Sequence, residues 1–129
     1  MNYATICPMR ILPAIIGVSL AFSIGRAFAD PPRVEDVRTD ELGGAWTISV
    51  TLRHPDTGWD HYADGWEVLA PDGTRLGFRE LAHPHVNEQP FTRSLSGIAI
   101  PKGTPFVLVR AHCNVDGWNT DTFKVQLGN

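Results

Sequence analysis

The strictest pattern in this 129-residue chain is an alternation of apolar and polar side chains over residues 45–53. The apolar positions are Trp46, Ile48, Val50 and Leu52, and the polar positions are Thr47, Ser49, Thr51 and Arg53. A period of two is typical of a β-strand with one buried and one wet face. A helix shows no such alternation and disfavours the β-branched residues. The segment therefore predicts a strand that lies against a core.

The rest of the chain repeats this kind of segment between turn formers. Further strands are predicted over residues 34–38, 65–70, 76–81, 91–100, 106–113 and 122–127. Residues 71–74 and 101–104, each with Pro at its start and Gly at its third position, predict tight turns. Gly97 is a candidate β-bulge within its strand. Because no stretch has a helical period, the prediction is an all-β fold, a single seven-stranded antiparallel β-sandwich.

The first 29 residues have the pattern of a leader. Arg10 precedes an almost wholly apolar run over residues 11–24, which is shorter than the roughly 20 residues that a bilayer span needs. Ala27-Phe28-Ala29 then supplies the small-x-small pattern that a signal peptidase recognises. We expect a cleaved signal peptide over 1–29, a domain over 30–129, and a periplasmic or secreted protein without a membrane span. The alternative is a retained membrane anchor.

Charge and cysteine usage narrow the function classes. Without its leader the chain has 9 basic and 14 acidic side chains, a net charge of −5. Nucleic acid and anionic membranes both need a basic face, so neither is expected as a partner. Cys113 is then alone, and no disulfide within the domain is expected. A lone thiol of this kind is either buried and inert, a metal ligand or an intermolecular link.

Two resemblances follow from particular residues. The frame from Leu95 to Ala111, with Ile100-Pro101 and Gly103-Thr104-Pro105 before alternating Val107 and Val109, resembles the closing half of an immunoglobulin-like or fibronectin type III domain. The chain also resembles a group of small exported bacterial proteins of unknown function. The shared pieces are Gly58 to Asp64, His83 to Val86 and Glu88 to Leu95. The first resemblance implies an immunoglobulin-like sandwich, and the second implies no activity.

Strand parity places the chemically active residues at one end of the sandwich. If each connection reverses the chain direction, the loops over 54–64, 83–91 and 112–121 all meet at the same end. These loops hold all five histidines, which are His54, His61, His83, His85 and His112, together with the carboxylates Asp56, Asp60, Asp64, Glu88 and Asp116. The turns at the opposite end have only Asp72 and Lys102 as charged residues.

One interpretation of this end is a metal site. His83 and His85 share a face of an extended segment, because alternate residues point to the same side. His61 or His112 supplies a third ligand, and Glu88 or Asp60 a further ligand or an outer acceptor. Neutral imidazoles and carboxylates suit copper, zinc or nickel. The alternative is that these side chains only hydrogen-bond the loops to one another.

The same loops carry candidate contact residues for other ligands. This predicted surface comprises Trp59, Asp60, Asp64, Asp116 and Trp118, and the two indoles suit stacking on a sugar ring. Catalysis is not expected, because no Gly-x-Ser-x-Gly elbow and no phosphate-binding glycine loop occur. We therefore predict an exported non-enzymatic domain whose end loops bind a small ligand or a protein. The alternatives are a copper or zinc domain and a carbohydrate-binding module.

Overall fold

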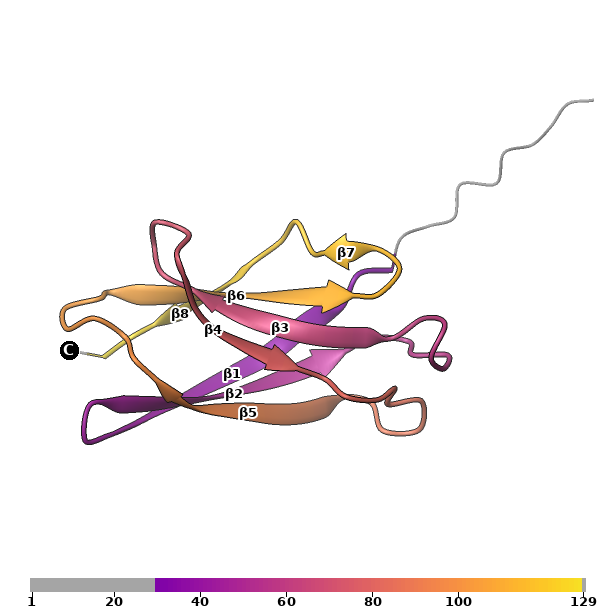
Figure 1. Ribbon diagram of the computed structural model, residues 1–129, viewed down its shortest axis with the longest axis horizontal. Coiled ribbons are helices and arrows are strands. Elements are labelled where there is room, and N and C mark those ends of the chain that lie inside the picture. Colours follow the sequence, from indigo (N-terminus) through magenta and orange to yellow (C-terminus); the bar gives the residue numbers. More distant parts are fainter. Residues whose placement is uncertain (1–29, 129) are drawn as a thin grey trace, which may run out of the picture.

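The computed structural model describes residues 30–128, which form eight β-strands and no helix (Figure 1). The strands are β1 (Arg33–Leu42), β2 (Ala45–Arg53), β3 (Ala63–Leu69), β4 (Arg75–Glu80), β5 (Phe91–Ile98), β6 (Phe106–Cys113), β7 (Gly117–Trp118) and β8 (Phe123–Gln126). The predicted signal peptide over 1–29 lies outside the described residues. Within residues 30–128, no helix is long and apolar enough to cross a membrane.

The strands form two antiparallel sheets, which confirms the all-β prediction. One sheet has the order β1-β2-β5, and the other has the order β4-β3-β6-β7, with β8 also paired to β6. The strand beyond the expected seven is the two-residue β7, which pairs with the end of β6. The first strand is longer than predicted, because Gly43 and Gly44 adopt φ angles of 62° and 85°. A two-residue turn of this kind closes a hairpin, so the polar residues after Arg38 pair with β2.

The core lies between the two sheets and follows the alternation. From the first sheet, Ile48, Val50 and Leu52 are buried, and from the second sheet Trp66, Val68, Val107 and Val109 are buried in the same cluster. Trp46 was expected inside but is only half-buried, at the edge of the cluster. Gly97 has a φ of 73°, and the β2–β5 register shifts between Trp46 and Ile48 opposite it. This is the predicted bulge, which a positive φ favours at glycine.

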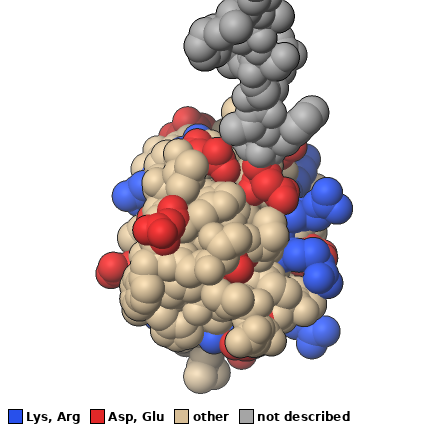
Figure 2. Space-filling view, turned by 90° about the vertical axis from the view of Figure 1, so that its right-hand side faces the viewer, with Lys and Arg blue, Asp and Glu red and all other residues tan. Residues whose placement is uncertain are grey.

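The connections lie as strand parity requires. Figure 1 shows the β2–β3, β4–β5 and β6–β7 loops at one end of the molecule, on the right of the view, and the β3–β4 and β5–β6 turns at the other end. Figure 2 looks onto the end that carries the three loops. Most of this face is uncharged, with separate acidic groups, and Lys and Arg side chains gather along one side of it.

Candidate metal centre

Three potential metal ligands converge where the core meets the loop end. His54, His61 and Cys113 each offer a ligand atom, and these atoms lie within 4.8 Å of one another. Among residues 30–128 this is the only group of three or more His, Cys, Asp or Glu side chains with such spacing. The group, called here the metal cluster, includes His61 of the predicted ligands. It does not include His83, His85, His112 or Glu88.

Two of these ligands extend the inward-facing positions of their strands. Leu52 is buried on β2, and two residues later His54 is also buried. On β6 the buried positions run through Ala111 and end at Cys113. Since side chains at i and i+2 share one face of a strand, both residues point between the sheets. The two strands belong to different sheets, so their ends close the core from opposite sides.

His61 reaches the cluster through a tight turn. Its backbone N–H donates to the carbonyl of Gly58, and its carbonyl accepts from Thr57 N–H. Gly58 has a φ of 146°, in a region that side-chain-bearing residues rarely adopt. The His61 and His54 rings meet edge to face with centroids 4.8 Å apart. The turn therefore folds the loop back over the end of β2.

The His54 ring is held by a buried carboxylate. Its Nδ1 lies 2.6 Å from Oδ1 of Asp56, and both side chains are fully buried. The same Oδ1 accepts the backbone N–H of Ala63 at 3.0 Å. The other ring nitrogen, Nε2, is buried and has no hydrogen-bond partner. This is the arrangement of metal-bound histidines, in which a carboxylate fixes the ring while the free nitrogen binds the ion.

His61 presents a second free nitrogen beside a carboxylate. Its Nε2 is also buried without a hydrogen-bond partner and lies 3.6 Å from Oδ2 of Asp116. The side chains of His61 and Asp116 are 28% and 22% exposed, so this side of the cluster lies near the protein surface. A carboxylate at this place is available as a fourth donor.

Cys113 contributes a buried thiol. Its Sγ accepts the N–H of Val115 at 3.5 Å and lies 3.9 Å from Oδ1 of Asn114. Burial raises the pKa of the thiol, so the free protein keeps the proton until an ion displaces it. Asn114 also fixes the loops, since it accepts Tyr62 N–H at 2.9 Å and donates to the Trp59 carbonyl at 3.0 Å.

Each of the two histidines in the β4–β5 loop has one ring nitrogen in a polar contact. His85 is 4% exposed and stacks on Phe91 with ring centroids 3.8 Å apart. Nη2 of Arg93 lies 2.9 Å from its Nε2, and Arg93 also pairs with Glu88. Burial, followed by the nearby Arg93 charge, lowers the pKa of His85, and Arg93 lowers the pKa of Glu88. Nδ1 of His83 is 3.0 Å from the Pro84 carbonyl. We call His83, His85, Glu88, Phe91 and Arg93 the loop cluster.

Most of the remaining predicted residues fall into two further groups, one around His112 and one around Trp59. His112 pairs with Asp64 and contacts Trp118 edge to face. The indole of Trp118 is covered by the guanidinium groups of Arg75 and Arg110, at 5.5 and 5.0 Å from its centroid. Trp59 is 67% exposed and contacts Tyr62. Asp60 is exposed in the turn beside it.

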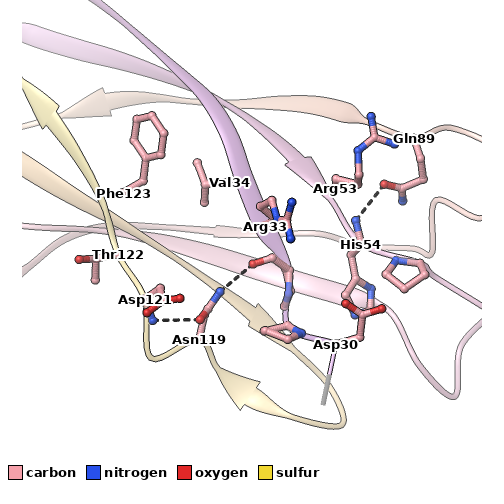
Figure 3. Close-up of a pocket in the computed structure, with 13 residues that line it drawn as sticks. Asp30, Arg33, Val34, Arg53, His54, Gln89, Asn119, Asp121, Thr122 and Phe123 are labelled. Carbon is pink, nitrogen blue, oxygen red and sulfur yellow. Dashed lines mark hydrogen bonds between the residues drawn. The ribbon is translucent and has the colours of Figure 1, made fainter. Parts of the chain in front are cut away.

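A groove of about 590 Å³ runs along the side of the domain behind His54 (Figure 3). Its walls come from the start of β1, the end of β2 and the segment before β8. Nδ2 of Asn119 donates to the Pro32 carbonyl at 2.8 Å and joins two of these walls. Val34 and Phe123 line it with apolar side chains, while Arg33 and Asp121 line it with charged ones.

Comparison with known proteins finds similarity both in sequence and in fold. No protein-family model matches the chain. A putative lipoprotein of Halomicrobium mukohataei is 49% identical over 93 residues, which are 71% of this chain and 45% of the relative. The chain thus spans a little under half the length of that relative.

Two solved structures share the fold. A hypothetical protein of Pyrococcus horikoshii has a TM-score of 0.53 at 18% identity, over 76% of this chain and 89% of that one. A superoxide reductase in its oxidized state has a TM-score of 0.50 at 16% identity, over 76% of this chain and 90% of that one. At these identities the likeness concerns the fold alone.

Proposed function

We propose that this domain binds one transition-metal ion at His54, His61 and Cys113, within an exported protein. The observation that carries the proposal is the pair of buried, unpartnered Nε2 atoms beside a buried thiol. A buried polar atom without a partner costs about 1–3 kcal/mol, so leaving two at one place needs a compensating role. A metal ion that accepts the lone pairs of both nitrogen atoms would compensate for this cost.

The size of the cluster suits a tetrahedral ion. Zinc–sulfur and zinc–nitrogen bonds of about 2.3 and 2.0 Å put neighbouring donors about 3.5 Å apart. The ligand atoms, within 4.8 Å of one another, need only a modest contraction. Asp116 supplies the fourth donor beside His61. Two imidazoles with one thiolate suit zinc or copper, and a strong carboxylate bond favours zinc while a weak fourth bond favours copper.

The test is a metal titration of protein purified without a histidine tag. We expect one equivalent of Co(II) or Cu(II) to produce an absorption band from thiolate-to-metal charge transfer. Zn(II) at about 100 times its dissociation constant stabilises by about 2.7 kcal/mol, which raises the melting temperature of a domain this size by about 10–20 °C. The absence of both the band and the shift with all three ions contradicts the proposal.

Redox chemistry at the same ion is a second candidate. It is supported by the fold neighbour that is a superoxide reductase and by the partly exposed His61 and Asp116 side of the cluster. Protein loaded with iron or copper should then consume superoxide in stopped-flow mixing while its metal absorption changes. If only the unbound metal reacts, the domain holds its ion for another purpose.

The other expectations stay proposals beside this one. The name of the Halomicrobium relative supports export or membrane anchoring. A non-enzymatic role, an immunoglobulin or fibronectin type III class for the sandwich, and an unidentified protein or small-ligand partner are proposed on the sequence patterns alone. For a carbohydrate-binding module, the exposed Trp59 remains available for stacking, whereas Trp118 is covered by two arginines.

A further inference from the structure

Asp56 joins the metal cluster to the loop cluster through its two carboxylate oxygens. Oδ1 faces His54 Nδ1 and Ala63 N–H, at 2.6 and 3.0 Å. Oδ2 accepts the backbone N–H of His85 at 2.8 Å. The carboxylate is buried, and within residues 30–128 no Lys or Arg forms a salt bridge with it. A buried carboxylate without a cation is costly, so its position calls for an explanation.

The hydrogen bond to Asp56 decides which nitrogen of His54 is free. A carboxylate only accepts, so the proton of a neutral His54 ring lies on Nδ1, between the ring and Asp56. The lone pair is then on Nε2, the buried atom without a partner. Without the carboxylate, the ring has no reason to keep this tautomer or this orientation.

The other oxygen of Asp56 binds the backbone of the β4–β5 loop. Arginine only donates, so the short contact from Arg93 makes Nε2 of His85 an acceptor and places the ring proton on Nδ1. That Nδ1 has no hydrogen-bond partner and lies 4.0 Å from Oδ2 of Asp56. The bond between Asp56 and the loop is therefore the one from the main-chain N–H of His85, while stacking on Phe91 fixes the ring.

From this geometry we propose that Asp56 is the positioning residue of the metal centre and couples metal occupancy to the loop over residues 81–90. The inference rests on the proposed function. An ion on Nε2 makes the Nδ1–H of His54 a stronger donor and brings the positive charge that the buried carboxylate lacks. Metal binding then strengthens the hydrogen bond between His54 and Asp56. The hydrogen bond from the His85 N–H to the other oxygen of Asp56 opens less often, so this amide exchanges its hydrogen more slowly.

Gln89 provides a matched control because it ties the same two segments without touching the imidazole. Its Oε1 accepts the backbone N–H of His54 at 3.0 Å, and its Nε2 donates to the His85 carbonyl at 3.0 Å. Gln89→Ala therefore loosens the attachment of the loop but leaves the ring of His54 on Asp56. Asp56→Asn removes the charge and places an amide donor against either His54 or the His85 N–H.

The experiment measures Co(II) binding to the wild-type protein and to the two variants. We expect Asp56→Asn to weaken Co(II) binding by roughly 10–100-fold and to shift the cobalt absorption bands, as losses of outer-sphere carboxylates do. Gln89→Ala should lower the melting temperature of the metal-free protein but keep the affinity within about threefold and the bands in place. Wild-type affinity and bands in Asp56→Asn overturn the inference.

A second measurement uses only the wild-type protein, so it does not depend on whether a variant folds. Amide hydrogen exchange at His85, followed by NMR in the wild-type protein, should slow when Co(II) or Zn(II) is added. An unchanged rate at His85 in protein that has bound its ion overturns the coupling while leaving the metal site intact. If the wild-type protein binds no ion, the proposed function itself fails, so the two failures are distinguishable.

Discussion

The metal cluster and the loop cluster each bring two histidines together, yet they use the imidazoles in opposite ways. In the metal cluster, Nε2 of both His54 and His61 is buried without a partner. In the loop cluster, the Nε2 of His85 accepts from Arg93, and the Nδ1 of His83 lies against a carbonyl. The availability of a lone pair, rather than the number of histidines in a loop, therefore separates a candidate ligand from a structural side chain.

The charges around the two clusters also favour a cation at the metal cluster over one at the loop cluster. Asp116 stands beside His61, and the thiol of Cys113 becomes an anion when an ion displaces its proton. The guanidinium of Arg93 lies beside His85 instead, and burial together with this charge lowers the pKa of that ring. The carboxylate of Glu88 is already paired with Arg93, so a cation at the loop cluster would have to approach that positive group. At the metal cluster the carboxylate of Asp116 faces His61 instead.

Among the changes that test this comparison, removal of the Cys113 thiol should have the largest effect on metal affinity. Cys113→Ser nearly preserves the side-chain volume but takes away the soft anionic ligand. We expect Co(II) affinity to fall by more than the roughly 100-fold upper range of outer-sphere changes, and the thiolate charge-transfer band to vanish. Absorption titration of both proteins measures this. Far-ultraviolet circular dichroism serves as the control, since the sheet spectrum should persist.

The pH dependence of the wild-type titration tests the same ligand. Because burial raises the pKa of the thiol, each bound ion must release this proton. The apparent affinity should therefore increase with pH through the neutral range. A band that survives in Cys113→Ser, or an affinity independent of pH, would assign the ion to other ligands.

Removing the loop histidines should give a smaller effect of a different kind. The double variant His83→Ala, His85→Ala leaves a cavity beside Phe91 and deprives Arg93 of an acceptor. We expect a loss of about 2–4 kcal/mol in unfolding free energy by urea denaturation. The rise in melting temperature with Zn(II) should remain, because the His85 backbone N–H still reaches Asp56. Loss of that rise would instead support the predicted site at His83 and His85.

The fold and the end-loop arrangement could be predicted from sequence because both follow local rules. Alternation places Ile48, Val50 and Leu52 inside, and strand parity brings three loops to one end. The Gly43-Gly44 hairpin was not among the predicted turns, although two consecutive glycines are a known signal for such a turn. The length of the first strand was missed for that reason.

The ligands could be predicted only in part. His61 was among the expected residues, and Cys113 was considered as a metal ligand, but His54 was counted only as one of the end-loop histidines. A usable signal exists, since both His54 and Cys113 occur two residues after the last buried apolar position of a strand. Which imidazole nitrogen is free cannot be deduced this way, because it depends on the contacts of the rings with Asp56 and Arg93. These contacts are set by how the β2–β3 and β4–β5 loops fold and not by the spacing of the residues in the chain.

The smallest expected effect concerns acid. The pKa of His85 is lowered in the folded protein, so between its folded value and the unfolded value of about 6.5 the unfolded chain binds more protons. Stability from this group is thus complete above about pH 6.5 and is lost as the pH falls through that value toward the folded pKa, with a slope below about 1.4 kcal/mol per pH unit. His85→Phe keeps the stacking on Phe91 and the backbone bond to Asp56 but cannot titrate. In chelator-treated protein, urea unfolding at pH 7.5 and pH 5.5 should show a larger acid loss for the wild type than for this variant. Equal losses would mean that His85 is as easily protonated in the fold as in the unfolded chain, and the loop cluster would then no longer differ from the metal cluster in its resistance to a positive charge.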